Sequence, residues 1–246
     1  MNNNLILVSG FSGTGKSMSL RNIENPEGVL YLNCESNKGL PFRASNQFMS
    51  KTITDPYKVY DYINQAAGRP DKIHTIAIDT LTFLMNMFES KYVLTSSNTQ
   101  KAWGDYSQFF QNLMMQYIAV IPQRVVFFAH TSEVVDNDKI AHVLVKVKGS
   151  LMNQGIESFF SNVISTKKVK LNKLDGYRDN NSLLTITPKE EILGIKHVFQ
   201  TQITKETINE RMRGPEDPPM WSIPETFIDN DLELVFKRLN EYYTAP

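Results

Sequence analysis

The sequence predicts an α/β fold: a mainly parallel central sheet with helices on both faces and an antiparallel extension at the C-terminal end. In the first half of the chain, short apolar runs rich in Val, Ile and Leu alternate with longer stretches of helical period, which is typical of βαβ units. From Ala141 onward, alternating strands separated by turn residues replace this pattern. The length of 246 residues is enough for one sizeable core. We therefore expect a single domain over residues 1–246, with its core at about 4–215.

The first half should supply the parallel part of the sheet. The expected strands are Leu5–Ser9, Val29–Asn33, Lys51–Thr54, Thr75–Ile78 and Arg124–Ala129. The expected helices are about Lys16–Ile23, Pro56 to about Ala67, and Leu81–Ile121 with an exposed loop at Thr95–Lys101. Apart from the short segment Lys51–Thr54, each strand is a short apolar run, and each helix has apolar residues at helical spacing.

The second half should supply the antiparallel part. The expected strands are Val143–Val147, Val163–Lys170, Leu183–Thr187 and His197–Ile203, with a turn at Asp175-Gly176. The C-terminal segment 229–243 is expected to hold an amphipathic helix from about Asp231 to Tyr242. Its apolar face would consist of Leu232, Val235, Phe236 and Leu239.

Composition and charge narrow the function classes. The apolar share of 41% and the charged share of 21% are those of a globular rather than a disordered or fibrous protein. Lys plus Arg and Asp plus Glu each number 26, so attraction to a polyanion must come from a local basic cluster. The single cysteine, Cys34, and the lack of a signal segment favour a cytoplasmic location. No apolar stretch approaches the ~18 residues of a membrane span, so no membrane partner is expected.

Residues 10–17 match a phosphate-binding loop. They read Gly-Phe-Ser-Gly-Thr-Gly-Lys-Ser, which satisfies G-x-x-x-x-G-K-[ST], and they lie between an expected strand and an expected helix. Backbone N–H groups and the helix amino end would point at the phosphates of ATP, Lys16 would reach the β- and γ-phosphates, and the Ser17 hydroxyl would bind Mg²⁺. The expected nucleotide-binding residues are Gly10, Ser12, Gly13, Thr14, Gly15, Lys16 and Ser17. A glycine-rich turn with a chance lysine is the alternative, which the flanking strand and helix disfavour.

An acid ends the apolar strand that follows further along the chain. Asp79 comes directly after Ile76-Ala77-Ile78, where a carboxylate would lie beside the water shell of the magnesium ion at the carboxyl edge of the sheet. We therefore expect Ser17 and Asp79 to hold the metal, with Asp79 as the Walker B acid. A turn aspartate at a strand end is the alternative.

The base that activates water is expected at another strand end. The residue after Asp79, where many helicases and AAA+ proteins carry a glutamate, is Thr80. Glu35 ends the strand that follows the loop and resembles the RecA-type arrangement, in which the catalytic carboxylate comes from the second strand. His130, after the strand Arg124–Ala129, resembles the γ-phosphate sensor of RecA-like proteins. The alternatives are a loop-capping role for Glu35 and an ordinary satisfied polar group for His130.

Arg211 and Arg213 form a third candidate group. They lie in Glu-Arg-Met-Arg-Gly-Pro, residues 210–215, which looks like the basic-x-basic-x-Gly segment of DnaB-like proteins. The resemblance implies that both side chains reach the γ-phosphate of a neighbouring subunit. Spacing by two puts them on one side of an extended segment, as this role requires. A solvated basic turn is the alternative.

Together these features resemble the RecA core over roughly residues 4–215. The layout is similar to that of phage-encoded single-domain RecA-like ATPases of the single-strand annealing and recombination group. The resemblance implies an ATP-hydrolysing homo-oligomer, either ring or filament, that binds single-stranded DNA in the host cytoplasm, with a single-strand-binding protein as a further partner. No equivalent of the recombinase polymerisation motif is found, which argues against strand exchange by this chain alone.

The same resemblance places DNA-binding loops at about Tyr92–Gly104 and Thr131–Ser150. The candidate DNA-binding residues are Lys101, Trp103, Lys139, Lys146 and Lys148. Lysines would contact phosphates and the tryptophan would stack on a base. Alternatively, Lys146 and Lys148 would face the nucleotide of a neighbouring subunit. The basic run Lys167–Lys173 is expected to be a solvated strand face.

The preferred interpretation is an oligomeric ATPase that binds single-stranded DNA during phage recombination or replication. The first alternative is an ATP-gated adaptor, such as a helicase loader or packaging accessory. The second is a P-loop small-molecule kinase. Such a kinase would need a basic helical lid, whereas Lys167–Lys173 has the pattern of a strand.

Overall fold

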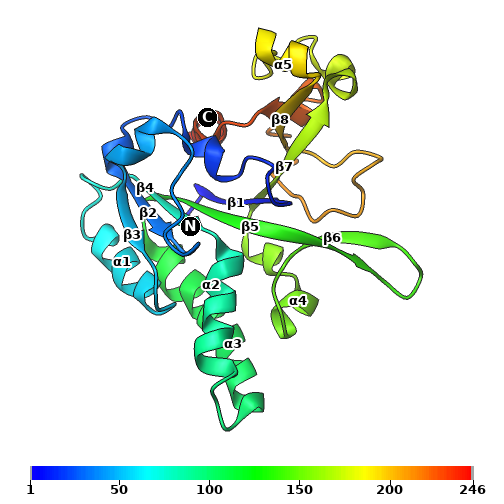
Figure 1. The fold of residues 1–246 in the computed structure, drawn as a ribbon. Helices are drawn as coiled ribbons and strands as arrows, with labels where there is room; N and C mark the ends of the chain where they lie inside the picture. The colour runs from blue at the N-terminus through cyan, green and yellow to red at the C-terminus, as the bar shows by residue number, and fades with distance from the viewer. Residues whose placement is uncertain (1, 245–246) are drawn as a thin grey trace.

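The computed structural model describes residues 2–244 and contains one mixed sheet with helices on both faces (Figure 1). Within these residues the sheet has nine strands in the order β3-β2-β4-β5-β1-β7-β8-β9, with β6 paired to β5. The strands are β1 (Leu5–Gly10), β2 (Val29–Asn33), β3 (Met49–Thr52), β4 (Thr75–Asp79), β5 (Arg124–Val135), β6 (Ala141–Val145), β7 (Asn162–Lys170), β8 (Ile195–Gln200) and β9 (Phe227–Asp229). The path from β3 to β7 is parallel, whereas β6, β8 and β9 are antiparallel to their neighbours.

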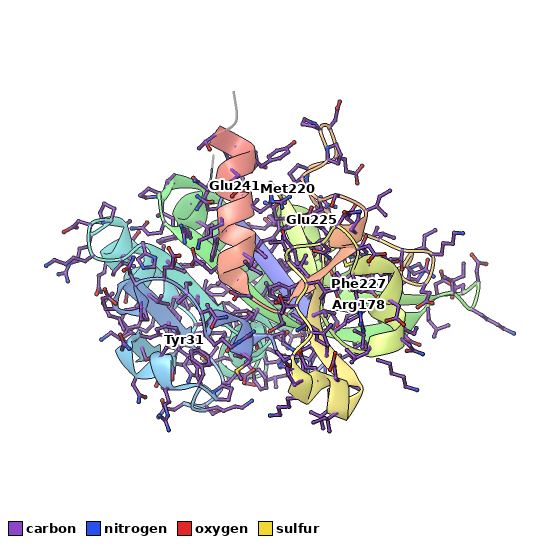
Figure 2. The ribbon with its side chains drawn as sticks, turned by 90° about the horizontal axis from the view of Figure 1, so that it is seen from above. Tyr31, Arg178, Met220, Glu225, Phe227 and Glu241 are labelled. Carbon is purple, nitrogen blue, oxygen red and sulfur yellow. The ribbon has the colours of Figure 1, made fainter. Side chains whose placement is uncertain are left out.

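Two hydrophobic layers enclose the sheet. The first layer consists of α1 (Lys58–Ala67), α2 (Leu81–Phe88) and α3 (Thr99–Asn112) on one face. The second layer is formed by α6 (Leu232–Thr244) on the other face (Figure 2). Because side chains alternate along a strand, Leu7 of β1 packs in the first layer while Ile6 and Val8 pack in the second. Burial on both faces explains why the central strands are continuous apolar runs.

Two short helices lie in connections between strands. They are α4 (Ser150–Gln154), between β6 and β7, and α5 (Pro188–Leu193), between β7 and β8. The topology confirms the predicted fold class: an α/β fold with a mainly parallel sheet, helices on both faces and an antiparallel C-terminal extension. The C-terminal helix and most strands lie near their predicted places.

The segment after the phosphate-binding loop is not the predicted helix Lys16–Ile23. It forms a single 3₁₀ turn, Ser17–Leu20. Polar side chains bond locally or to distant groups instead of supporting a longer helix: the Ser19 hydroxyl donates to the Lys16 carbonyl at 2.6 Å, and Asn22 Nδ2 donates to a carboxylate near the C-terminus at 2.6 Å. The prediction was wrong because these polar contacts, one of them long-range, outweigh a weak helical period.

β5 is longer than the predicted Arg124–Ala129 and continues through the expected polar boundary Thr131–Glu133. Its second half pairs with β6 from Thr131↔Val145 to Val135↔Ala141, forming a hairpin that projects from the sheet (Figure 1). β-branched residues in both arms favour this extended backbone. Much of the predicted DNA-binding loop 131–150 is therefore a regular hairpin.

Two further segments differ from the prediction. Leu183–Thr187 is not a strand, because Thr187 forms a capping box with Glu190 and begins α5. The predicted loop Thr95–Lys101 is shorter, because the Asn98 side chain accepts a hydrogen bond from Lys101 N at 3.0 Å and begins α3. Lys101 and Trp103 consequently lie on a helix rather than in a loop.

Every helix within residues 2–244 is too short or too polar to cross a bilayer.

The second layer depends on Phe236 of α6, which is fully buried and has the Arg124 guanidinium 5.1 Å from its ring centre. Phe236→Ala should lower the free energy of unfolding by about 3–5 kcal/mol, because it removes core packing and leaves a cavity. Urea unfolding followed by circular dichroism measures the loss. Lys237→Ala, on the exposed side of the same helix, should change the value by less than about 1 kcal/mol. Equal losses in both variants would contradict this packing.

Candidate active site

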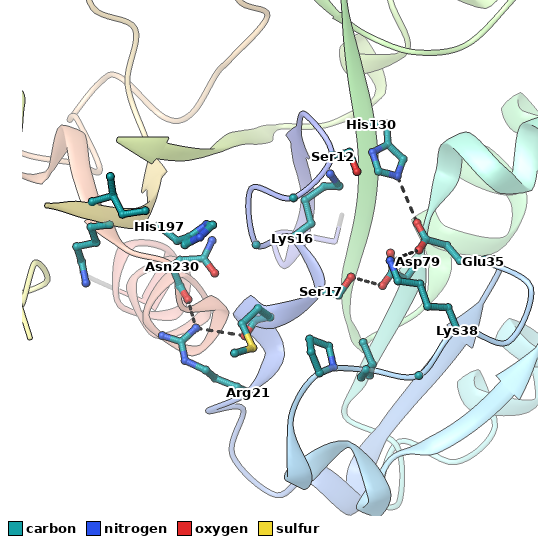
Figure 3. A pocket seen from close by; sticks show the side chains of 18 of the residues that line it. Ser12, Lys16, Ser17, Arg21, Glu35, Lys38, Asp79, His130, His197 and Asn230 are labelled. Atoms are coloured by element: carbon teal, nitrogen blue, oxygen red, sulfur yellow. Dashed lines mark hydrogen bonds and ion pairs between the residues drawn. The ribbon is translucent and has the colours of Figure 1, made fainter. Parts of the chain in front are cut away.

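Four neighbouring strands line one cavity of about 640 Å³: β2, β4 and β1 at their carboxyl ends and β5 at His130, in the middle of the strand (Figure 3). Strand register fixes this arrangement: Gly10 lies beside His130, and Asn33, two residues before Glu35, lies beside Asp79. Glu35, Asp79 and His130 line the cavity together with Ser12, Gly13, Gly15, Lys16 and Ser17 of the loop. The structure therefore brings the predicted loop, Walker B acid, base and sensor into one place.

The backbone of the loop requires glycine at two positions in particular. Gly15 has φ +100°, a conformation that other residues rarely adopt. A Cβ on Gly10 would lie 2.5 Å from the Thr166 hydroxyl oxygen of β7. The Thr14 hydroxyl also bonds the Thr166 hydroxyl, and His197 Nδ1 of β8 lies 2.8 Å from the Thr14 carbonyl. β7 and β8 thus support the loop from outside the four-strand site.

Lys16 is held inside the loop that carries it. Its side chain leaves the residue only 6% exposed, and Nζ donates to the Gly10 carbonyl at 3.0 Å and to the Phe11 carbonyl at 2.8 Å. Burial lowers the pKa of the ammonium to about 8, although the nearby carboxylates of Asp79 and Glu35 oppose this shift. A phosphate entering the loop would find a cation that is poorly solvated and already in position.

Asp79 and Ser17 form the candidate metal site. Asp79 is 1% exposed; its Oδ2 accepts hydrogen bonds from Ser17 Oγ at 2.5 Å and from Tyr31 OH at 2.7 Å. Its Oδ1 is buried and has no hydrogen-bond partner within residues 2–244. Burial raises the pKa of this carboxyl. An unpaired carboxylate oxygen next to a hydroxyl fits Mg²⁺, which needs few protein oxygens when phosphates complete its shell. The described residues contain no cluster of three or more His, Cys, Asp or Glu side chains suited to a metal.

Glu35 and His130 face each other across the cavity. His130 Nε2 lies 3.3 Å from Glu35 Oε1, and Lys38 Nζ lies 3.4 Å from the other carboxylate oxygen. The hydrogen bond with His130 is the main cause that lowers the pKa of Glu35, so the carboxylate is charged at neutral pH. Backbone bonds position both residues: Asn33 Oδ1 accepts from Glu35 N at 2.9 Å, and Thr82 Oγ1 accepts from His130 N at 2.9 Å.

Arg211 and Arg213 lie away from this cavity. Arg211 Nη1 is 3.3 Å from Oε2 of Glu157, a buried residue whose other carboxylate oxygen accepts from Val145 N at 2.7 Å. Arg213 pairs through its backbone with Val163 in the first half of β7. Within one chain the two arginines therefore contact β7 and the segment between β6 and β7 rather than the phosphate-binding loop.

The candidate DNA-binding residues lie on α3, at the turn of the hairpin and in the segment after β6. Lys101 Nζ pairs with Asp105 at 2.6 Å, and Lys148 Nζ pairs with Glu89 at 2.8 Å. The Trp103 ring lies edge-on to Tyr106, with ring centres 5.2 Å apart, and against Gly149. The remaining two lysines, Lys139 at the hairpin turn and Lys146 after β6, are exposed. Two of the four candidate lysines are thus already paired with acids of the same chain.

Four residues of the site were not predicted from the sequence. Tyr31 bonds Asp79, while Arg21, His197 and Asn230 line the far end of the cavity. Tyr31 could have been suspected, because a polar group in a buried strand next to the Walker B strand needs a partner. Arg21, His197 and Asn230 carry no motif, and only the tertiary fold brings them together.

Comparison with known proteins gives a family match that includes the loop and most of the sheet. Residues 2–193 match a family described as AAA domain. The search of curated proteins gave no match. Among solved structures, a KaiC-like protein from the hyperthermophilic archaeon Pyrococcus horikoshii OT3 aligns with a TM-score of 0.42 and 10% sequence identity, covering 86% of this chain and 83% of that chain.

The lowered pKa of Lys16 predicts a pH dependence of ATP binding. Phosphates favour the charged ammonium, so binding should take up a proton above about pH 8, and affinity should fall by up to about tenfold per pH unit there. Calorimetric titrations from about pH 7 to about pH 9.5 in buffers of different ionisation enthalpy measure both effects. Lys16→Arg, which stays charged, is the control. The same slope above pH 8 in both proteins would refute the assignment to Lys16.

Proposed function

We propose that this chain, which belongs to the AAA-domain family, is a Mg²⁺-dependent ATPase that works as a homo-oligomer on single-stranded DNA in phage recombination or replication. The observation that carries the proposal is the meeting of Lys16, the Ser17–Asp79 pair and the Glu35–His130 pair around one cavity. The cavity thus contains a cation that can bind phosphates, oxygens that can bind a metal and a charged carboxylate that can activate water. These are the groups that phosphoryl transfer to water requires.

The residues divide the hydrolysis step between them. Lys16 would bind the β- and γ-phosphates, and Ser17 with Asp79 would hold Mg²⁺, which neutralises charge on the transferring phosphoryl group. Glu35 would accept a proton from the attacking water, since its carboxylate is charged and opens into the cavity. Thr80 is unsuited to the role of base, because its hydroxyl accepts from Phe83 N and caps α2.

His130 would connect the nucleotide to the hairpin. Its carbonyl accepts a hydrogen bond from Lys146 N at 2.8 Å, directly after β6, and β5 continues from His130 into the projecting arm. A γ-phosphate that draws Glu35 or His130 toward itself would therefore shift the base of the hairpin. This is the kind of contact through which a nucleotide orders or releases a binding element.

Binding of single-stranded DNA is proposed for the face that carries the hairpin. Lys139 and Lys146 are exposed there, and repetition in a ring or filament would multiply a small number of phosphate contacts. Arg211 and Arg213 would act across a subunit boundary, which requires Arg211 to leave Glu157. A single-strand-binding protein in the host cytoplasm is the proposed further partner.

A specific observation also favours an ATP-gated adaptor, such as a helicase loader or packaging accessory. The hairpin exposes Val134, Val135 and Ile140, and apolar side chains suit a protein partner better than a phosphate backbone. In that case ATP would govern protein docking rather than DNA binding.

The proposal is tested by ATPase rates with and without single-stranded DNA, and by DNA retention in the presence of ATP. Glu35→Gln should lower turnover by about 10²- to 10⁴-fold while ATP still binds, because the amide keeps the shape but accepts no proton. Lys16→Ala should lose both binding and turnover. Glu206→Gln, an exposed change outside the cavity, is the control. Turnover that DNA does not stimulate, with no DNA retained, would overturn the DNA role and favour the adaptor.

The shared site is tested by mixing two inactive proteins. Arg211→Ala and Lys16→Ala subunits should regain part of the activity when mixed, because some interfaces then combine an intact Lys16 with an intact Arg211. Glu157→Gln removes the partner of Arg211 within the chain and leaves the guanidinium free. If Arg211 only stabilises its own chain, mixing will restore nothing and Glu157→Gln will be as harmful as Arg211→Ala.

A further inference from the structure

The cavity extends well beyond the phosphate-binding loop. Its far end, which we call the distal pocket, is lined by Arg21, Leu193, Ile195, His197 and Asn230 (Figure 3). These residues come from the 3₁₀ turn after the loop, from α5 and β8, and from the segment between β9 and α6. The residues proposed above for metal and water, which are Ser17, Asp79, Glu35 and His130, lie at the other end (Figure 3). The distal pocket is therefore positioned to bind the nucleoside part of a nucleotide whose phosphates lie in the loop.

Asn230 presents an unused amide to this pocket. The residue is 3% exposed, and neither Nδ2 nor Oδ1 has a hydrogen-bond partner within residues 2–244. The amide faces the loop, since a Cβ placed on Gly15 would lie 3.3 Å from Asn230 Oδ1. Leaving a buried donor and a buried acceptor unpaired destabilises the protein, because both groups lose the hydrogen bonds that they make with water in the unfolded chain. A group that lines a cavity and carries this cost is suited to a ligand that satisfies both atoms.

The backbone of Asn230 is fixed from both sides. Arg21 Nη1 donates to the Asn230 carbonyl at 2.6 Å, and the next residue, Asp231, accepts from Asn22 Nδ2 at 2.6 Å. The turn that follows the phosphate-binding loop thus holds the segment that carries the amide. A preorganised amide loses little entropy when a ligand binds.

The connection between β7 and β8 supplies an apolar wall. Two antiparallel strands need only about two residues between them, yet residues 171–194 intervene here. This excursion has its own small core, including Leu174 and Leu184. Lys196 Nζ anchors residues 171–194 to the sheet, because it pairs with Glu190 of α5 at 2.8 Å and with Asp229 of β9 at 3.0 Å. As a result Leu193, 57% exposed, is held against the pocket next to Ile195.

We propose that the distal pocket binds the adenine base, with Leu193 and Ile195 against its face and the Asn230 amide on its edge. This inference rests on the proposed nucleotide-binding function of the loop. One amide donates and accepts at once, which matches the amino group and N7 of adenine when that edge of the base faces Asn230; with the same edge toward the amide, guanine offers two acceptors, O6 and N7, and would leave Asn230 Oδ1 unpaired. Asn230 is thus the residue that determines base specificity, and Arg21 positions it.

The test compares ATP, GTP and inorganic tripolyphosphate as ligands of the full chain. Tripolyphosphate occupies the loop but has no base. Asn230→Ala should weaken ATP binding by about tenfold and reduce the preference for ATP over GTP to within about threefold, with tripolyphosphate binding unchanged. An equal loss for ATP and tripolyphosphate would mean that Asn230 only shapes the loop. An unchanged ATP/GTP ratio would also overturn the proposal.

Two matched controls separate base recognition from general damage. Asn162 of β7 is an equally buried amide without partners in the described chain, but it lies outside the cavity, so Asn162→Ala should leave all three affinities unchanged. Leu193→Ala should weaken ATP binding several-fold, whereas Ile192→Ala, at a neighbour that is 87% exposed and outside the pocket, should not. Equal effects at 192 and 193 would refute the apolar wall.

The comparison of ATP, GTP and tripolyphosphate affinities does not depend on whether the chain hydrolyses ATP. A wild-type protein that binds ATP but neither hydrolyses it nor retains DNA would contradict the proposed function, and the base-specificity comparison would still be decided. Conversely, active wild-type protein with unaltered ATP and GTP affinities in Asn230→Ala would sustain the proposed function and reject the distal pocket.

Discussion

Parallel pairing of β2, β4, β5 and β1 determines where every charged group of the site lies. Backbone hydrogen bonds set Gly10 opposite His130 and Asn33 opposite Asp79, so that polar residues following four apolar runs reach the same edge together. A slip of one residue in any of these strands would turn its side chains to the opposite face, because side chains alternate along a strand. It would also move core residues such as Ile78 and Phe127 from the first layer into the second, where other side chains are already packed. The same register therefore secures both the core and the chemistry.

Within that frame the environment moves three titrating groups in different directions. Burial raises the pKa of Asp79 and lowers that of Lys16, whereas the bond from His130 lowers the pKa of Glu35. Burial disfavours charge on both Asp79 and Lys16, so each gains when a counter-charge arrives, a metal at one and a phosphate at the other. Glu35 already has its partners and keeps its charge. Burial thus prepares Asp79 and Lys16 to bind a metal and a phosphate, whereas hydrogen bonding keeps Glu35 charged and able to act as a base.

The sequence predicted the parts of this site that depend on local order along the chain. The loop at residues 10–17 has a fixed motif, and Glu35, Asp79 and His130 each follow an apolar run, so strand ends alone predict that they meet. The helix after the loop was predicted wrongly, because Asn22 bonds Asp231, a partner more than two hundred residues away. Asn230 and α5 were missed for the same reason: neither has a periodic pattern that points to the loop. Arg211 was chosen by motif, and the buried Glu157 that pairs with it carries no signal in the sequence.

The 3₁₀ turn at Ser17–Leu20 has a consequence for the way in which the loop attracts phosphate. A helix dipole is the sum of many aligned peptide units, and one short turn supplies few of them. Much of the attraction therefore falls on the ammonium of Lys16. A dipole of peptide groups is permanent, whereas an ammonium whose pKa is about 8 is lost to a modest rise in pH. Because the helix is replaced by a short turn, the affinity of this loop for phosphate should depend on whether Lys16 is protonated.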